Sequence, residues 1–182
     1  MENRIIPFSF NPNPNKKKVY PTLFTLLAVG AALTVLSVTS EKFKGLISLA
    51  AVIFLGGAMY LFIRYVGQEY VYNVSYNASD EPMLVISKVI GKRISTMCAV
   101  PLYSIISIQK FTKSGEKYVP DKTVHRYNFI ATFGPEYFFV IKSVSRTEKC
   151  EIALECTDEM KDRLILYAGI ALEMKKRDDE EE

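Results

Sequence analysis

Residues able to bind metal or to act as nucleophiles are scarce in this sequence. Its 182 residues include one histidine, His125, and three cysteines, Cys98, Cys150 and Cys156. Neither a Cys-x-x-Cys nor a His-x-x-x-His spacing occurs, which argues against a structural zinc site. An odd, sparse set of cysteines is not a disulfide framework, and free thiols are typical of a reducing compartment.

Recognisable catalytic and phosphate-binding motifs are also absent. The sequence contains no glycine-rich phosphate loop and no Gly-x-Ser-x-Gly motif. Its acidic residues fall in predicted turns and on exposed strand positions, so no pair of carboxylates is expected at a cleft. The net charge of +3 is far below the basic excess of nucleic-acid-binding proteins. We therefore expect a non-enzymatic protein with no cofactor, metal or nucleic-acid partner; an enzyme of unrecognised type is the alternative.

Two long uncharged runs dominate the first third of the sequence. Residues 19–40 and 45–63 contain no charged side chain, and about 20 apolar residues suffice for a helix to cross a bilayer. A buried core helix is the alternative, but such helices rarely lack charge on every face. A cleaved signal peptide would have a shorter run, with no second run behind it. The sequence predicts two transmembrane helices, at about 19–40 and 45–66.

The link between these helices is so short that they must be antiparallel neighbours. Both ends of the chain are therefore expected on one side of the membrane. Within residues 1–67, the basic residues are Arg4, Lys16, Lys17 and Lys18 before the first run, Lys42 and Lys44 in the link, and Arg64 after the second run. The positive-inside rule places both termini in the cytoplasm of a cell-membrane protein. Neither run holds an ionisable residue, which indicates an anchor and not a transport pathway.

Four segments follow from these patterns. They are a mobile N-terminal tail at 1–18, the transmembrane hairpin at 19–66, a domain at 68–176 and an acidic tail at 177–182. Residues 5–15 are rich in proline and asparagine, which predicts irregular backbone. The domain shows the alternation of half-buried strands between turn signals. Seven strands are predicted, at 69–76, 83–90, 93–100, 103–111, 126–133, 137–142 and 149–156.

The end of the domain has the pattern of a helix. Thr157 is a favourable N-cap, and Asp158 and Glu159 occupy the first turn, where the helix dipole favours acids. Apolar residues then recur at helical spacing, and the basic residues 175–177 close the last turn. The thiols are expected to be small core residues. Cys150 and Cys156 fall on the apolar face of their strand, and Cys98 shares a face with Ile94 and Val100.

Two segments of the domain resemble a known family. They are the strand, hairpin and strand from Met83 to Arg93, and the run Val100-Pro-Leu-Tyr-Ser-Ile-Ile-Ser-Ile-Gln109. With seven strands and a last helix, they resemble the bacterial pleckstrin-homology-like (PH-like) family, whose members often follow a pair of transmembrane helices. The resemblance implies a membrane-anchored α+β fold, in which a two-helix transmembrane hairpin precedes a seven-stranded PH-like antiparallel β-barrel with a C-terminal capping helix. It implies no catalytic residues, and fold alone does not imply function.

A basic loop is the candidate binding site. Its cationic residues are Lys110, Lys113, Lys117, Lys122, His125 and Arg126. Such a group is typical of a site for lipid headgroups or for an acidic partner. The alternative is a solvated loop, because Glu116 and Asp121 dilute its charge.

These patterns favour a membrane-tethered interaction domain. We expect it to be a scaffold or accessory subunit for another membrane-associated protein. The alternative is that the barrel senses a lipid headgroup or a small ligand. The expected partners are the lipid bilayer and a membrane protein, and the oligomeric state is left open.

Overall fold

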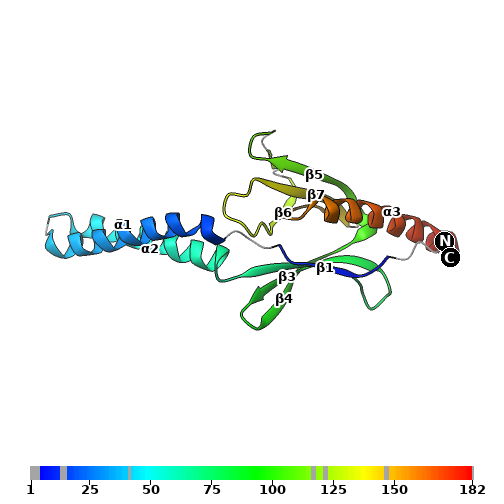
Figure 1. Ribbon diagram of the computed structural model, residues 1–182, viewed down its shortest axis with the longest axis horizontal. Helices are drawn as coiled ribbons and strands as arrows, with labels where there is room; N and C mark the ends of the chain where they lie inside the picture. Colours follow the sequence, from blue (N-terminus) through cyan, green and yellow to red (C-terminus); the bar gives the residue numbers. More distant parts are fainter. Residues whose placement is uncertain are drawn as a thin grey trace. The chain divides into compact units, whose positions relative to one another are not determined.

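The computed structural model describes residues 5–12, 16–40, 42–115, 118–120, 123–145 and 148–181. The chain divides into two compact units (Figure 1). A helical unit holds residues 14–69 and 132–134, and a β-rich unit holds the rest of the chain. The β-rich unit therefore takes its residues from three separate stretches.

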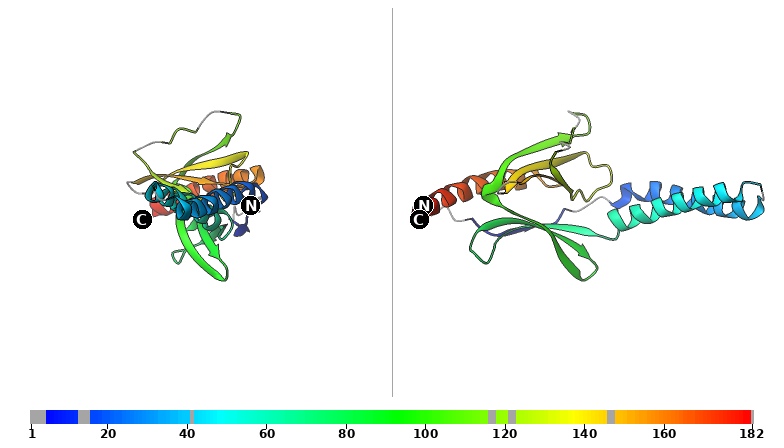
Figure 2. Two further views of the ribbon diagram at one scale, coloured as in Figure 1. Left: turned by 90° about the vertical axis from the view of Figure 1, so that its left-hand side faces the viewer. Right: turned by 180° about the vertical axis from the view of Figure 1, so that it is seen from behind.

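Two antiparallel helices form the helical unit. Helix α1 spans Tyr20–Thr39 and helix α2 spans Lys44–Tyr65. They lie side by side in both views of Figure 2, and a short 3-10 helix, η1 (Lys16–Lys18), precedes α1. By length and composition, both helices are able to cross a membrane. Only 17% and 11% of their most apolar stretches are buried, so the structure does not support the alternative of two buried core helices.

Small residues let α1 and α2 approach closely. A Cβ atom added to Gly30 would lie 2.7 Å from Leu55 Cδ2, so only glycine fits there without displacing Leu55. The buried residues of each helix recur at seven-residue intervals, which is typical of helices that cross at a small angle. They are Leu23, Gly30 and Ser37 on α1, and Ala51 and Ala58 on α2.

An ion pair links the two ends of the hairpin. Lys16 Nζ, before α1, lies 2.8 Å from Oε1 of Glu69, which follows α2. The Gln68 side-chain amide donates to the Arg64 carbonyl at 3.0 Å. The amide therefore satisfies one of the backbone carbonyls that a helix C-terminus leaves without an intrahelical partner.

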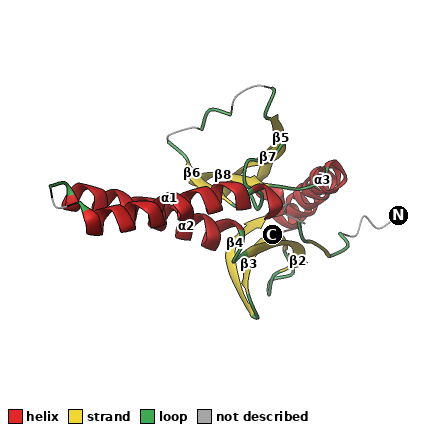
Figure 3. Ribbon diagram, turned by 60° about the vertical axis from the view of Figure 1, so that its left-hand side comes forward, coloured by secondary structure: helices red, strands yellow, loops and turns green. Residues whose placement is uncertain are grey.

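Two four-stranded sheets make up most of the β-rich unit (Figure 3). Sheet A has the order β1-β2-β3-β4, and sheet B has the order β5-β7-β8-β6. Sheet A consists of β1 (Phe8–Phe10), β2 (Glu69–Tyr76), β3 (Pro82–Ile90) and β4 (Arg93–Pro101). Sheet B consists of β5 (Ile105–Thr112), β6 (His125–Asn128), β7 (Tyr137–Ser145) and β8 (Glu148–Leu154). A 3-10 helix, η2 (Leu102–Ser104), joins the sheets, and helix α3 (Asp158–Glu181) follows β8.

Most of the predicted strands are confirmed. Strands β2, β3, β4, β5, β7 and β8 lie where alternation predicts them. Leu154, on the predicted apolar face of β8, is fully buried. Thr157 is the predicted N-cap, and its Oγ1 accepts a hydrogen bond from the Met160 N–H at 3.2 Å.

The N-terminal segment forms a strand where the sequence predicts irregular backbone. Strand β1 pairs antiparallel with β2, with Phe8 opposite Val74. Ile5 is buried, and its carbonyl accepts a hydrogen bond from Tyr76 Oη at 3.1 Å. The prediction of irregular backbone is therefore wrong at β1. A three-residue strand is too short to show alternation, and its partner strand follows both helices of the hairpin.

Strand β6 differs from its prediction in length and in direction. It is limited to His125–Asn128 where residues 126–133 are predicted, and it runs parallel to β8. The prediction of antiparallel strands throughout is therefore wrong at β6, and the described strands form two open sheets in place of a closed barrel. Alternation reports which face of a sheet a residue occupies, and it is the same for either strand direction.

Helix α3 continues beyond its predicted end. The sequence predicts that it closes at residues 175–177 before an acidic tail, whereas the helix runs to Glu181. Lys175 Nζ lies 3.2 Å from Asp179 Oδ1 one turn later, and this hydrogen bond raises the pKa of Lys175. The ion pair offsets the unfavourable effect of acidic side chains at a helix C-terminus.

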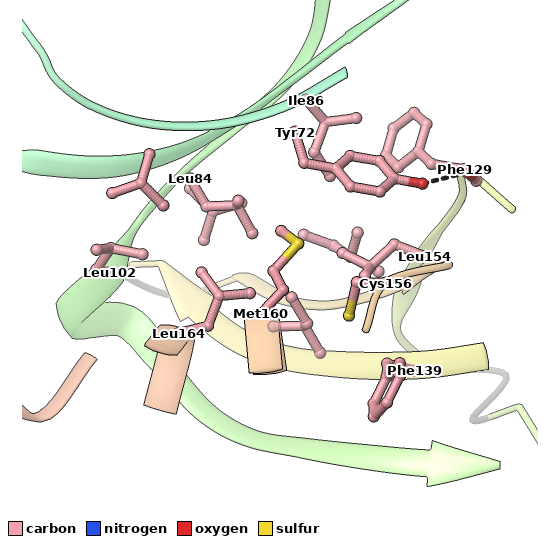
Figure 4. Packing of buried hydrophobic residues seen from close by; sticks show 14 of the residues in the cluster. Tyr72, Leu84, Ile86, Leu102, Phe129, Phe139, Leu154, Cys156, Met160 and Leu164 are labelled. Atoms are coloured by element: carbon pink, nitrogen blue, oxygen red, sulfur yellow. Dashed lines mark hydrogen bonds between the residues drawn. The ribbon is translucent and has the colours of Figure 1, made fainter. Parts of the chain in front are cut away.

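The core of the β-rich unit lies between the two sheets and α3 (Figure 4). Met160 and Leu164 of α3 and Leu84 of β3 are buried in it. Tyr72 of β2 is fully buried as well, and its Oη donates to the Phe129 carbonyl at 2.9 Å. Burial raises the pKa of Tyr72, so the hydroxyl stays a donor. This bond ties sheet A to the chain that leaves β6 of sheet B.

Removal of the Tyr72 hydroxyl should destabilise the β-rich unit, because the buried Phe129 carbonyl loses its donor. We expect Tyr72→Phe to lower the free energy of unfolding by about 1–3 kcal/mol. Tyr127→Phe is the control: its side chain is 41% exposed, and the change expected there is within about 0.5 kcal/mol. Urea unfolding of the full chain in detergent micelles, followed by circular dichroism, measures both. Equal midpoints for Tyr72→Phe and the unaltered protein would contradict the role of this bond.

Candidate binding surfaces

The structure does not gather the predicted basic loop into one site. Lys110 lies on β5, and His125 and Arg126 lie on β6, at the opposite edge of sheet B. Two strands lie between them, so the backbones of β5 and β6 are separated by about 14 Å at the usual strand spacing. Lys117 and Lys122 lie outside the described residues.

The charge of Lys110 is engaged within the β-rich unit. Its Nζ lies 2.6 Å from Asp158 Oδ2 and 4.6 Å from the centre of the Tyr137 ring. The hydrogen bond from Lys110 lowers the pKa of Asp158, which is the first residue of α3. Lys110 therefore positions the start of the helix. Lys113 is exposed just after β5 and stays available to a ligand.

Arg126 belongs to a cluster that already contains a carboxylate. Its guanidinium lies 4.5 Å from the centre of the Tyr118 ring, and Tyr118 Oη donates to Glu151 Oε2. The Glu151 side chain is buried, with Lys142 Nζ 3.6 Å from its Oε1. The cluster joins three strands of sheet B to residue 118, so these groups serve packing within the sheet.

His125 lines a cleft of about 170 Å³ within the β-rich unit. The lining comes from β4 and sheet B: Cys98, Ala99, Val100, Pro101, His125, Tyr127, Ser143, Lys149 and Cys150. The Ser143 hydroxyl is buried and already lies 2.7 Å from that of Ser104. Lys149 and His125 remain as exposed polar groups. The volume is below the roughly 300–1,000 Å³ of drug-sized ligand sites, so the cleft suits only a small polar or anionic molecule.

Two of the three cysteines predicted to be core residues pack against the core but are only partly buried. Cys156 is buried as predicted, but Cys98 and Cys150 are partly exposed and line the cleft. Ile86 pairs with Cys98 whereas Ser87 pairs with Thr96. The resulting bulge puts Cys98 and Ile94 on opposite faces of β4, which overturns their predicted shared face.

Burial weakens the nucleophilicity of these thiols. It raises the pKa of Cys98 to about 11, with a smaller contribution from Cys150, and that of Cys156 to about 12. Both thiols therefore stay protonated at neutral pH, and the thiolate is the reactive form. Within the described residues, no group of three or more histidine, cysteine or acidic side chains has the arrangement of a metal site.

The outer face of α3 carries an apolar surface that the sequence analysis did not single out. We call it the α3 outer face; it consists of Ile165, Leu166, Gly169 and Leu172, spaced so that they share one side of the helix. Exposed Asp162 and Glu173 lie on the same side, at the two ends of this face. The three aliphatic side chains are 49%, 60% and 44% exposed. Among the residues that the structure describes, nothing lies within 4 Å of a Cβ atom added to Gly169. The inner face of α3, with Leu164, already covers the core, so the outer face is free for a partner.

The raised pKa of Cys98 predicts its alkylation profile. Below the pKa, the thiolate fraction rises about tenfold per pH unit. We therefore expect the rate of reaction of Cys98 with iodoacetamide to keep rising between about pH 8 and pH 10, whereas free cysteine levels off above its pKa of about 8.5. Peptide mass spectrometry of the full chain resolves each cysteine, and buried Cys156 should react only on unfolding. A plateau for Cys98 near pH 9 would contradict the shift.

The chain matches no protein-family model, no curated protein and no solved structure.

Proposed function

We propose that this chain is an integral membrane protein in which α1 and α2 tether a non-enzymatic, PH-like interaction domain to the cytoplasmic face of the cell membrane. The domain acts as a scaffold or accessory subunit for another membrane-associated protein. The tether is supported by two apolar helices of sufficient length whose large side chains are mostly exposed. Such surfaces are unfavourable in water and favourable in a bilayer.

The PH-like assignment is supported by the order of the elements. The segment Met83–Arg93 contributes β3 and the turn into β4, and the segment Val100–Gln109 contributes the end of β4, η2 and most of β5. Strands β2–β8 are followed by a helix that covers the core. The added strand β1 and the parallel strand β6 are departures from the layout that the resemblance implies.

Placement of both chain ends on one side of the membrane is supported by the pairing of β1 with β2. Strand β1 precedes α1, and β2 follows α2. Two strands of one sheet cannot pair across a bilayer, so a hairpin that spans it must return the chain to the side from which it started. The excess of basic residues at these ends favours the cytoplasmic side.

The α3 outer face is the observation that carries the interaction role. It exposes three large aliphatic side chains on a helix whose opposite side is already packed. Contiguous exposed apolar patches mark interaction sites. Ion pairs flank this face, as between Arg163 Nη2 and Glu159 Oε1 at 3.0 Å, which resembles the polar rim around an apolar interface centre.

Charges placed on the α3 outer face should release the partner. We expect Leu166→Glu with Leu172→Glu to abolish co-purification of a stoichiometric membrane partner in mild detergent, because unpaired charges would enter an apolar interface. The matched control is Ile106→Glu with Val119→Glu, at exposed aliphatic side chains outside α3. Retention of the partner by the α3 variant, or recovery of copies of this chain alone, would contradict the proposal.

Cysteine labelling tests the topology. In a variant whose native cysteines are replaced by serine, Ser40→Cys should react with an impermeant maleimide in intact cells. Asn13→Cys should react only after permeabilisation, because it precedes α1 on the cytoplasmic side. Labelling of position 13 but not 40 from outside would reverse the proposed orientation, and labelling of neither in permeabilised cells would show that the sites are inaccessible.

A second candidate function is sensing of a small polar ligand, and the cleft lined by His125 and Lys149 is the observation that favours it. A bound ligand would cover Cys98, which lines the same cleft. Ligand-dependent protection of Cys98 from alkylation would support this function in place of the scaffold role.

A further inference from the structure

The distal half of the β3–β4 hairpin extends beyond the core. Buried residues end at Ser87 on β3 and resume at Val100 on β4. All residues from Ile90 to Met97 are exposed, and successive residues of a strand point to opposite faces, so neither face is covered here. The ribbon of this hairpin projects from the sheets in Figures 1 and 2. We call residues 88–97 the distal hairpin.

Apolar and basic side chains lie next to each other at its tip. Ile90, Ile94 and Met97 are 49%, 72% and 49% exposed. Gly91, with φ +58°, allows the tight turn, and Lys92 and Arg93 follow it. The tip thus combines large aliphatic side chains with two adjacent cations.

The surrounding sequence contains no acidic residue to offset this charge. No aspartate or glutamate occurs from residue 82 to residue 115. Within the described part of the chain, Lys88, Lys92 and Arg93 form no ion pair. The cations of the distal hairpin are therefore not neutralised by its own strands, in contrast to Lys110, which is paired with Asp158.

We infer that the distal hairpin docks on an anionic lipid bilayer, with Ile90 and Ile94 entering the headgroup region and Lys88, Lys92 and Arg93 binding lipid phosphates. Aliphatic side chains beside Lys and Arg are the combination that binds charged membrane interfaces. This inference rests on the proposed membrane tether. Only residues 66–68 link α2 to β2, and three extended residues span at most about 11 Å, so the start of β2 stays near a bilayer that holds α2.

The absence of tryptophan from the chain makes Ile94→Trp a unique fluorescent reporter. The full chain is reconstituted in vesicles of phosphatidylcholine alone, or with about one third phosphatidylserine, at low salt where charge attraction is strongest. With phosphatidylserine we expect a blue shift of the emission, and quenching when the acyl chains are brominated. Lys92→Gln with Arg93→Gln should remove at least half of the quenching, whereas Lys176→Gln with Arg177→Gln, on α3, should not change it.

The remaining outcomes overturn the inference. The first two are no blue shift and an equal blue shift in phosphatidylcholine vesicles. A blue shift without quenching by the brominated acyl chains would show that a protein, and not lipid, covers the tip. Equal quenching of an Ile106→Trp reporter on β5 would show that the lipid contact is not specific to the distal hairpin. Carbonate extraction of the same vesicles tests the tether separately. A chain that resists extraction but shows no quenching refutes the lipid contact alone, and a chain that is extracted refutes the tether.

Discussion

One buried phenol joins the two sheets of the β-rich unit. Tyr72 of sheet A donates from its Oη to the Phe129 carbonyl at 2.9 Å, and Tyr72 Oη accepts a hydrogen bond from the Glu155 N–H at 3.5 Å. Phe129 follows β6 and Glu155 follows β8, so one hydroxyl group contacts the ends of two strands of sheet B. A buried polar group must keep its partners, and neither sheet closes on itself. The lining of the cleft, drawn from β4 and sheet B, and the start of α3 at Asp158 both depend on how the two sheets are held.

Local patterns predicted most of the fold because they report local constraints. Alternation gave the positions of β2–β5, β7 and β8, and the cap at Thr157 gave the start of α3. Strand β1 could not be predicted, since its three residues are a strand only through pairing with β2. The direction of β6 was equally inaccessible, because a parallel and an antiparallel strand have the same alternation. These features are set by contacts between distant segments.

The candidate sites also combine features that local sequence patterns predict with features that depend on contacts between distant segments. Lys110 and Arg126 flank one loop in the sequence, but the strand order β5-β7-β8-β6 places them at opposite edges of sheet B. Residue spacing does not predict the order of strands in a sheet. The surface of α3 was predicted only in part. The sequence predicted its stripe of buried apolar residues but not its exposed aliphatic residues. The basic character of the distal hairpin was visible in the sequence as a run without acids from 82 to 115. The sequence does not show that these strands extend beyond the core. Because they do, the basic side chains of the distal hairpin are exposed and can contact a ligand.

The pairing of β1 with β2 makes the α1–α2 hairpin an insertion within sheet A. During synthesis, β1 leaves the ribosome before α1 but has no partner until β2 emerges behind α2. Completion of the sheet therefore waits until both helices have been made and, under the proposed membrane tether, until both ends of the hairpin lie on one side of the bilayer. A chain with only one helix inserted keeps the outer edge of β2 unpaired, and unpaired edges are templates for aggregation. Under the proposed membrane tether, folding of the β-rich unit would therefore depend on insertion of both helices.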